Sequence, residues 1–261
     1  MTIADKLMTI TDNMQRVFNA GYLEGHDNGV EAGKKAEYDA FWDAYQQNGA
    51  RVNYSCAFGA PWTAETLRPK HSMQPISALM MFRECGANID LAKRLDELGV
   101  TLDFSKATNL QYLFQNSVFS RVGVIDMSGC NQRQPGNALF AYCSNLKTID
   151  KIILRSGAGG EFSSDAFLNC SALEEVRFDG LITSDVDLHW STKLSKRSIL
   201  SIMGSAYEGG YFPNDGFTVT LSRAAVNKAF ETSEGANDGS TSAEWQDVLD
   251  LPTRYHDTVL S

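Results

Sequence analysis

The sequence predicts an α+β fold with three parts: a long, coiled-coil-like N-terminal helix, a short solenoid of stacked repeats, and a C-terminal α/β cap. Two observations lead to this prediction. Apolar residues recur at heptad positions near the N-terminus, and further along four segments share one apolar pattern at nearly constant spacing. Because a single short strand cannot bury its apolar face alone, such segments are expected to stack on one another.

The N-terminal segment is expected to be helical as far as about residue 47. Its apolar residues alternate by four and three positions, which is the a/d seam of a coiled coil. We expect this seam to join copies of the chain into a homotrimer; the alternative is an amphipathic helix that packs on its own domain. The five predicted oligomerisation residues are Ile3, Leu7, Ile10, Met14 and Val17.

Four glycines then follow at a spacing of four, from Gly21 to Gly33. Each glycine weakens a helix interior, so the segment is either a hinge or a continuous helix whose glycines let neighbouring backbones approach closely. Both readings remain open from the sequence. Helix resumes along an aromatic stripe at residues 38–45 and ends near Gly49. Residues 1–49 are therefore predicted to be a helical oligomerisation and anchoring segment.

The four repeated segments begin at residues 95, 119, 146 and 173, which are 24, 27 and 27 residues apart. This spacing and an L-x-x-L-x-L pattern are typical of the strands of leucine-rich repeats. Lys151 occupies an apolar position of the third segment, which predicts a bulge or a one-residue shift there. The predicted core residues of these strands are Leu95, Leu98, Val100, Phe119, Val122, Val124, Leu146, Ile149, Leu173, Val176 and Phe178.

A second series of motifs precedes the strands in the same register. Each motif has phenylalanine followed three residues later by cysteine or serine, beginning at Phe82, Phe114, Phe140 and Phe167. Cysteine at such a position serves as a small buried apolar residue. Phe140, Cys143, Phe167 and Cys170 therefore complete the predicted repeat core. These motifs resemble the BspA-like leucine-rich repeat over about residues 76–182, which implies a solenoid with an N-terminal cap over residues 50–182.

The repeat period is lost after residue 182, and residues 183–261 are predicted to cap the far end of the solenoid. A helix is expected from a serine N-cap at Ser195, a strand over residues 217–221, and two further helices after Ser222 and over residues 243–249. Three aromatic residues lie near glycines in this region, where they either form a recognition surface or pack on the last repeat. They are Tyr207, Tyr211 and Phe212.

Composition limits the classes of partner. The 261-residue chain has a formal net charge of −9, which argues against nucleic acids and anionic membranes as partners. It has no apolar run long enough for membrane insertion and no secretory-signal pattern at its start. Five cysteines without a C-x-x-C pair are expected to stay reduced, as in proteins made in a cytosol.

The sequence offers little catalytic chemistry. The four histidines are scattered singly, and the glycine-rich segment at residues 157–160 lacks the lysine that a phosphate-binding loop needs. Neither paired carboxylates across a cleft nor a Ser-His-Asp triad is indicated. We therefore expect no catalytic residue, no cofactor and no metal site, and we expect that the protein is not an enzyme.

Both ends of the chain carry a further resemblance. The segments at residues 33–45, 194–200, 218–222 and 225–230 resemble those of leucine-rich-repeat tail proteins from phages and prophages of gut Firmicutes. The resemblance implies a structural bacteriophage virion component of the baseplate or tail fibre, assembled in the host cytoplasm. Its partners would be copies of itself, other tail proteins, and a host surface glycan or protein. The alternatives are a bacterial cell-surface BspA-like adhesin and, less favoured, a glycan-active enzyme.

Overall fold

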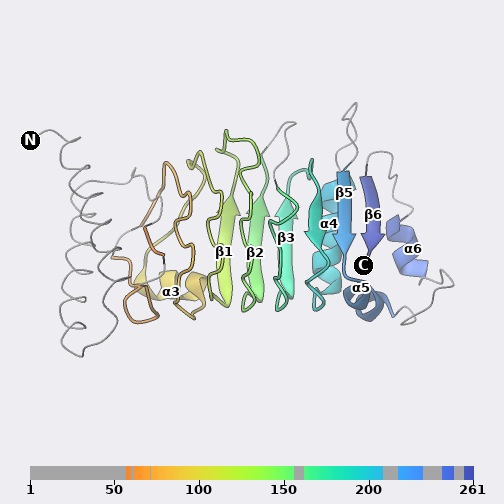
Figure 1. Ribbon diagram of the computed structural model, residues 1–261, viewed down its shortest axis with the longest axis horizontal. Helices are drawn as coiled ribbons and strands as arrows, with labels where there is room; N and C mark the ends of the chain where they lie inside the picture. Colours follow the sequence, from red (N-terminus) through yellow and green to blue (C-terminus); the bar gives the residue numbers. More distant parts are fainter. Residues whose placement is uncertain are drawn as a thin grey trace, which may run out of the picture.

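A computed structural model describes residues 57–59, 62–70, 72–155, 162–207, 217–231, 243–249 and 256–261. The chain advances along one long axis, and successive strands lie side by side in chain order (Figure 1). The first sheet contains β1 (Arg121–Asp126), β2 (Thr148–Ile153) and β3 (Glu175–Asp179), all parallel. The second contains β4 (Val186–Leu188), β5 (Phe217–Leu221) and β6 (His256–Leu260), also parallel.

Helices flank both sheets. They are α3 (Leu91–Leu98), α4 (Lys196–Tyr207), α5 (Arg223–Phe230) and α6 (Ala243–Leu249). Helix α3 contacts β1 at the start of the first sheet, whereas α4 packs against β3 at its end. The helices therefore cover the ends of the first sheet, where its backbone groups would otherwise lack partners.

The predicted fold class is wrong. Within the described ranges the chain forms two small three-stranded parallel sheets and four helices, instead of a four-repeat solenoid with a separate cap. The periodic signal fails at both ends, because the first predicted strand is a helix and the C-terminal region builds a sheet of its own. The predicted long N-terminal helix, its five seam residues and the glycine segment at residues 21–33 lie outside the described residues.

The first repeated segment, predicted as a strand from Leu95 to Val100, is mostly helix α3. The side chain of Asp90 caps this helix by accepting from Lys93 N, and Gly99 ends it in the left-handed conformation with φ 66°. An L-x-x-L pattern also places two residues on one helix face, so it cannot distinguish a helix from a strand. The caps on either side decide the outcome.

The other three segments do form strands, each beginning two residues later than its predicted motif. Parallel pairing aligns Val122 with Ile149, and Ile149 with Val176. The register then shifts between Ile149 and Ile152 where β2 pairs with β3, which confirms the predicted irregularity around Lys151. Strand β1 keeps the register of β2, so Val124 pairs with Lys151 and lies 46% exposed instead of in the core.

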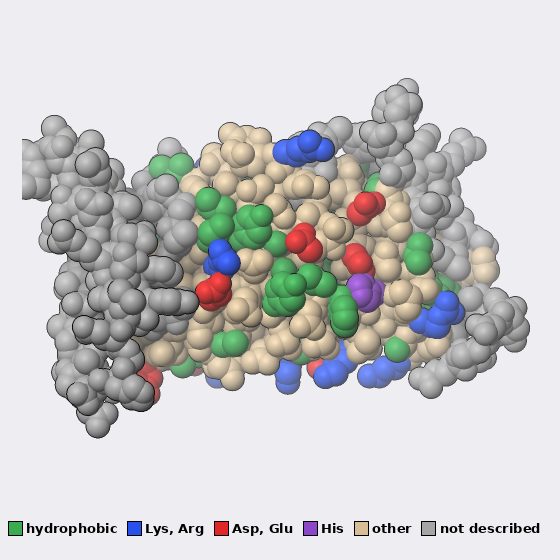
Figure 2. All heavy atoms as spheres, in the orientation of Figure 1, with side chains coloured by type: hydrophobic (Ala, Val, Ile, Leu, Met, Phe, Trp, Pro, Cys, Tyr) green, Lys and Arg blue, Asp and Glu red, His purple; other side chains and the backbone are tan. Residues whose placement is uncertain are grey.

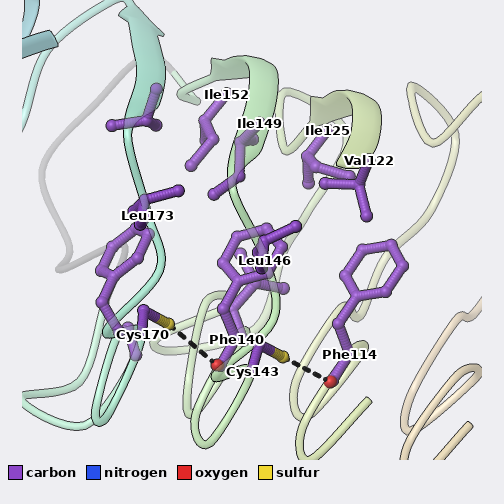
Figure 3. Close-up of a cluster of buried hydrophobic side chains, with 14 of the residues drawn as sticks. Phe114, Val122, Ile125, Phe140, Cys143, Leu146, Ile149, Ile152, Cys170 and Leu173 are labelled. Atoms are coloured by element: carbon purple, nitrogen blue, oxygen red, sulfur yellow. Dashed lines mark hydrogen bonds between the residues drawn. The ribbon is translucent and has the colours of Figure 1, made fainter. Parts of the chain in front are cut away.

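A column of phenylalanine rings runs along the stack on the other side of the core from the first sheet. Figure 3 shows the rings of Phe114 and Phe140 pointing toward aliphatic side chains of the strands, and the thiols of Cys143 and Cys170 pointing toward carbonyl oxygens of the neighbouring turns. Ring centroids of successive members lie 5.2, 5.3, 5.4 and 5.7 Å apart. The members are Phe58, Phe82, Phe114, Phe140 and Phe167. These distances suit offset stacking of aromatic rings in a close-packed interior.

Backbone hydrogen bonds join the phenylalanine turns as strands are joined in a sheet. Phe114 N donates to Leu139 O at 3.0 Å, and Phe140 N donates to Ala166 O at 2.8 Å. The turns require positive φ values between 45° and 65° at non-glycine residues two positions before or after the phenylalanines. Such residues cost roughly 1 kcal/mol or more each, so the bonds between turns and the buried rings must stabilise them.

Helix α4 terminates the first sheet with serine hydroxyls. Val176 N donates to Ser198 Oγ at 2.9 Å, and Phe178 N donates to Ser201 Oγ at 3.0 Å. These two amides point to the same side of β3, where a further strand would otherwise accept their hydrogen bonds. The two hydroxyls therefore replace a strand and close the sheet edge.

The C-terminal secondary structure follows the sequence closely. The strand at residues 217–221 and the helix at residues 243–249 have the predicted bounds, and Ser195 Oγ accepts from Ser198 N at 3.2 Å as the N-cap of α4. Strands β4 and β6 were not predicted. Strand β4 has three residues, which is too short for a periodic signal.

Replacing Phe140 with alanine should lower the free energy of unfolding by about 3–5 kcal/mol, because the ring is fully buried between two others. Urea denaturation of the full chain measures this change. The control is Val124→Ala, which removes an exposed side chain and should change stability by less than about 0.5 kcal/mol. Equal losses in the two variants would contradict a structural role for the ring column.

Replacing Ser198 with alanine should cost about 1–3 kcal/mol, because the buried amide of Val176 then loses its acceptor. The matched control is Ser144→Ala at an exposed turn, with an expected change below about 0.5 kcal/mol. Hydrogen exchange should show faster exchange of the Val176 amide in Ser198→Ala alone. Unchanged exchange at Val176 would show that the hydroxyl does not close the edge.

Candidate binding surface

Most of the predicted repeat-core residues lie in the core of the described structure. Leu98 and Val124 do not: they are 39% and 46% exposed. Leu98 is the last residue of α3 and lies on its exposed face. Val124 is exposed because β1 has the same irregularity as β2, which places Val124 opposite Lys151. The buried ones are Leu95, Val100, Phe119, Val122, Phe140, Cys143, Leu146, Ile149, Phe167, Cys170, Leu173, Val176 and Phe178.

The predicted recognition aromatics are not brought together among the described residues. Tyr207 is the last residue of α4, whereas Tyr211 and Phe212 lie outside the described ranges. That surface therefore stays a prediction. Two other surfaces of the stack have a definite geometry: the outward face of the first sheet, and the outward face of the phenylalanine turns.

The outward face of the first sheet carries charges that are paired with one another. The guanidinium of Arg121 makes two hydrogen bonds to the carboxylate of Asp150, at 2.8 and 3.0 Å, and also lies 3.6 Å from Asp90. The Asp150 hydrogen bonds are the largest cause that raises the pKa of Arg121. Lys151 lies 3.0 Å from Asp179. Because these groups already satisfy each other, a ligand would have to displace internal ion pairs to use them.

The outward face of the phenylalanine turns carries mostly uncharged side chains, unlike the outward face of the first sheet. In each turn, the residue just before the cysteine or serine of the motif points outward, and these residues form one row along the stack. We call this set the turn row: Glu84, Asn116, Tyr142, Asn169 and Trp190. From Asn116 onward, amides and aromatic rings alternate in it. The first four have positive φ values, between 57° and 65°.

Hydrogen bonds fix the order of the turn row. Asn116 N donates to Ala141 O at 2.7 Å, and Tyr142 N donates to Leu168 O at 2.6 Å, so these turns are adjacent. Ser191 Oγ donates to Cys170 O at 3.2 Å, which places the turn of Trp190 next to that of Asn169. Tyr142 and Trp190 are therefore two layers apart. Within the described residues, the amides of Asn116 and Asn169 make no side-chain hydrogen bond.

The two rings of the turn row are accessible. Tyr142 is 48% exposed and Trp190 is 43% exposed, which is unusual for large aromatic side chains. The ring of His189 lies 4.7 Å from that of Trp190, and its Nδ1 is 2.7 Å from Asp187 Oδ1. This contact orients the imidazole beside the indole. Figure 2 shows a face on which apolar side chains, acidic side chains and a histidine lie across the middle, with Lys and Arg side chains mostly near its edges.

The cysteines under the turns are not a reactive site. Cys143 Sγ donates to Phe114 O at 2.9 Å, and Cys170 Sγ donates to Phe140 O at 3.2 Å. Burial raises the pKa of Cys143 to about 11 and the pKa of Cys85 and of Cys130 to about 12, and it also raises the pKa of Cys170. Since the thiolate is the nucleophile and metal ligand, these protonated thiols serve packing.

The described ranges hold no cluster of three or more histidine, cysteine, aspartate or glutamate residues arranged to bind a metal ion. None of the helices in those ranges is both long enough and apolar enough to cross a membrane. The described surface does carry exposed rings, amides and a histidine held by a carboxylate.

Comparison of the chain with known protein families, with curated proteins and with solved structures finds no match.

Sequence reasoning missed Tyr142 and Trp190, although a signal for both was present. Tyr142 lies two positions after Phe140, inside a recognised motif. The segment from Leu188 to Leu194 continues that motif, with leucine in place of phenylalanine and Ser191 in place of cysteine, as Ser117 is in the Phe114 motif. Extending the motif by one unit would have placed Trp190 in the same row.

The four described thiols should react slowly with an aromatic disulfide reagent at pH 8 in the native protein and rapidly in urea, because burial keeps them protonated. The buried thiols should also make stability depend on pH. Below pH 9, the unfolded pKa, the Cys143 thiol is protonated in both states and its full contribution to the stability of the fold is present. This contribution is lost as the pH rises toward 11, because the unfolded thiol loses its proton before the folded one does. Between pH 9 and pH 11, the Cys143 thiol should lower the free energy of unfolding by about 1.4 kcal/mol for each pH unit.

Urea denaturation at pH 8 and pH 10 measures that loss, and Cys143→Ala is the matched control. The variant should lose less stability than the native chain over this pH interval, because it lacks one buried thiol. Rapid labelling of the folded protein, or identical pH dependence in both chains, would contradict the assignment.

Proposed function

We propose that this chain is a non-enzymatic structural component of a phage tail, in the baseplate or a tail fibre. In this proposal its stacked core presents the turn row to the host surface or to a neighbouring tail protein. The observation that supports a binding role is the turn row itself: two exposed aromatic rings and two amides without side-chain partners in the described chain, held at regular spacing.

The stack favours binding because its outward side chains start from a rigid backbone. The turns are joined by hydrogen bonds of 2.6–2.8 Å at the amides of Asn116, Tyr142 and Phe140, and the rings below them are fully buried. A preorganised surface loses little conformational entropy when it binds. A role in recognition uses this rigidity, whereas a catalytic role would need reactive groups that converge on one point.

The tail setting rests on the sequence resemblance of the segments at both ends of the chain. In that setting the N-terminal seam would join three copies, so that three turn rows are presented together. Several weak sites on one assembly then bind a repetitive surface with higher avidity than one site alone. Assembly in the host cytoplasm also agrees with protonated, unpaired thiols.

Particles released from a lysogen of the bacterium that carries this gene provide the test. After purification on a density gradient, peptides of this chain should be found by mass spectrometry in the virion band, and gold-labelled antibodies should mark the tail. A capsid-directed antibody serves as the positional control. Detection on the surface of uninduced cells and absence from particles would overturn the tail proposal in favour of a bacterial adhesin.

A further inference from the structure

We infer that the turn row binds a linear, uncharged polysaccharide laid along the axis of the stack. This inference deepens the proposed function and rests on its binding role. It specifies the chemical class of the ligand and the residues that contact it: Asn116, Tyr142, Asn169 and Trp190.

The chemistry of the turn row matches that of a sugar chain. A pyranose ring has a face of C–H groups, which packs on an aromatic ring, and an edge of hydroxyl groups, which both donate and accept hydrogen bonds. Tyr142 and Trp190 supply accessible rings, 48% and 43% exposed. Asn116 and Asn169 supply amides, and each amide can donate and accept at once.

The spacing of the turn row also matches. Layers joined by backbone hydrogen bonds repeat at about 4.8 Å, so Tyr142 and Trp190 are roughly 10 Å apart along the stack. Sugar units in an extended glycan repeat at a similar interval to the layers. A chain lying along the row would therefore place alternate units on the two rings and set the amide of Asn169 beside the unit between them.

Electrostatics select an uncharged chain over an anionic one. The one carboxylate of the turn row, Glu84, is 3.3 Å from the guanidinium of Arg83, which offsets part of its charge. One acidic group lies close to Trp190: Asp187 contacts His189, whose ring lies 4.7 Å from that of Trp190. With a net charge of −9 over the chain, this surface disfavours teichoic acids and other polyanions.

The shape of the turn row favours a glycan over a protein partner. A stable protein interface buries about 800 Å² on each side around an apolar centre. The row is instead one residue wide, and amides separate its rings. Of the other large exposed apolar side chains among the described residues, Leu98 belongs to α3, Val124 to β1, Leu200 to α4 and Val259 to β6, and Ile76 lies six residues before Phe82.

The test uses the full chain on an array of immobilised uncharged oligosaccharides, two to six units long, that includes glucose, mannose, galactose and N-acetylhexosamine series. Purified teichoic acid and host surface protein extract serve as the other ligand classes. At least one uncharged series should bind, with affinity rising as the chain lengthens to four units and then levelling. Calorimetry on the best hexasaccharide then gives the affinity.

Variants of the turn row locate the site on the chain. Tyr142→Ala and Trp190→Ala should each lower affinity for that hexasaccharide at least tenfold, and Asn169→Ala severalfold. Tyr142→Phe should stay within about twofold, because the ring and not its hydroxyl makes the contact. Val124→Ala, which removes an equally exposed apolar group from β1, is the control and should bind as the native chain does.

The outcomes separate this inference from the proposed function. Binding to no uncharged oligosaccharide, tighter binding to teichoic acid or to host protein, or unchanged affinity in folded Trp190→Ala each overturns the inference. Circular dichroism confirms that each variant is folded. If the chain is present in virion tails but binds no glycan, the tail proposal stands and only the ligand assignment fails. If the chain binds a glycan but is absent from virions, the ligand assignment stands and the tail proposal fails.

Discussion

The stacking of phenylalanine rings along one axis is the constraint on which the rest of the structure depends. Each ring occupies the full width of a layer, so the next turn must place its own ring directly above, 5.2–5.7 Å away. This spacing is close to the separation of hydrogen-bonded strands, and the same layers can therefore be joined by backbone hydrogen bonds. Ring stacking and backbone pairing reinforce each other because both require the same repeat distance.

The same constraint determines what the surface presents. Once Phe140 and Cys143 point inward, Tyr142 between them must point outward, in a left-handed conformation with φ 65°. That conformation disfavours most residues, yet the hydrogen bonds between turns maintain it. Outward side chains are thereby held in a straight row at the repeat distance. The proposed binding of a linear glycan rests on this regular spacing.

The end of the first sheet is closed by side-chain hydroxyls, whereas its interior layers are joined by backbone hydrogen bonds. At the end of the first sheet, hydroxyls of Ser198 and Ser201 accept the amides that a further strand would have used. Beyond Phe167 the interior residues of the turns become aliphatic, as at Leu188 and Leu221, and the turns themselves become the strands of a second sheet. Parallel strands need long crossover connections, which are often helical. In the second sheet α4 lies between β4 and β5, and α5 lies between β5 and β6.

The sequence by itself determined the features that depend on local pattern and repeat spacing. These are the strand segments of the first sheet, the buried phenylalanines and cysteines, the irregularity at Lys151, the C-terminal strand and helices, and the serine cap of α4. Each follows from side-chain type at fixed intervals, which is a property of the chain alone. The segment at Leu95 shows the limit, because its pattern fits helix and strand equally and only the caps at Asp90 and Gly99 distinguish them.

Tertiary structure decided the rest. The exposure of Val124 follows from its pairing with Lys151 across a shared register shift, which no pattern within one segment reveals. The second sheet forms because β4, β5 and β6 meet from positions far apart in the chain. The turn row likewise exists only after stacking, since its members are 21 to 32 residues apart in sequence. The repeated motif gives the positions of its members in the chain, but their alignment is set by hydrogen bonds between layers that form only in the folded structure.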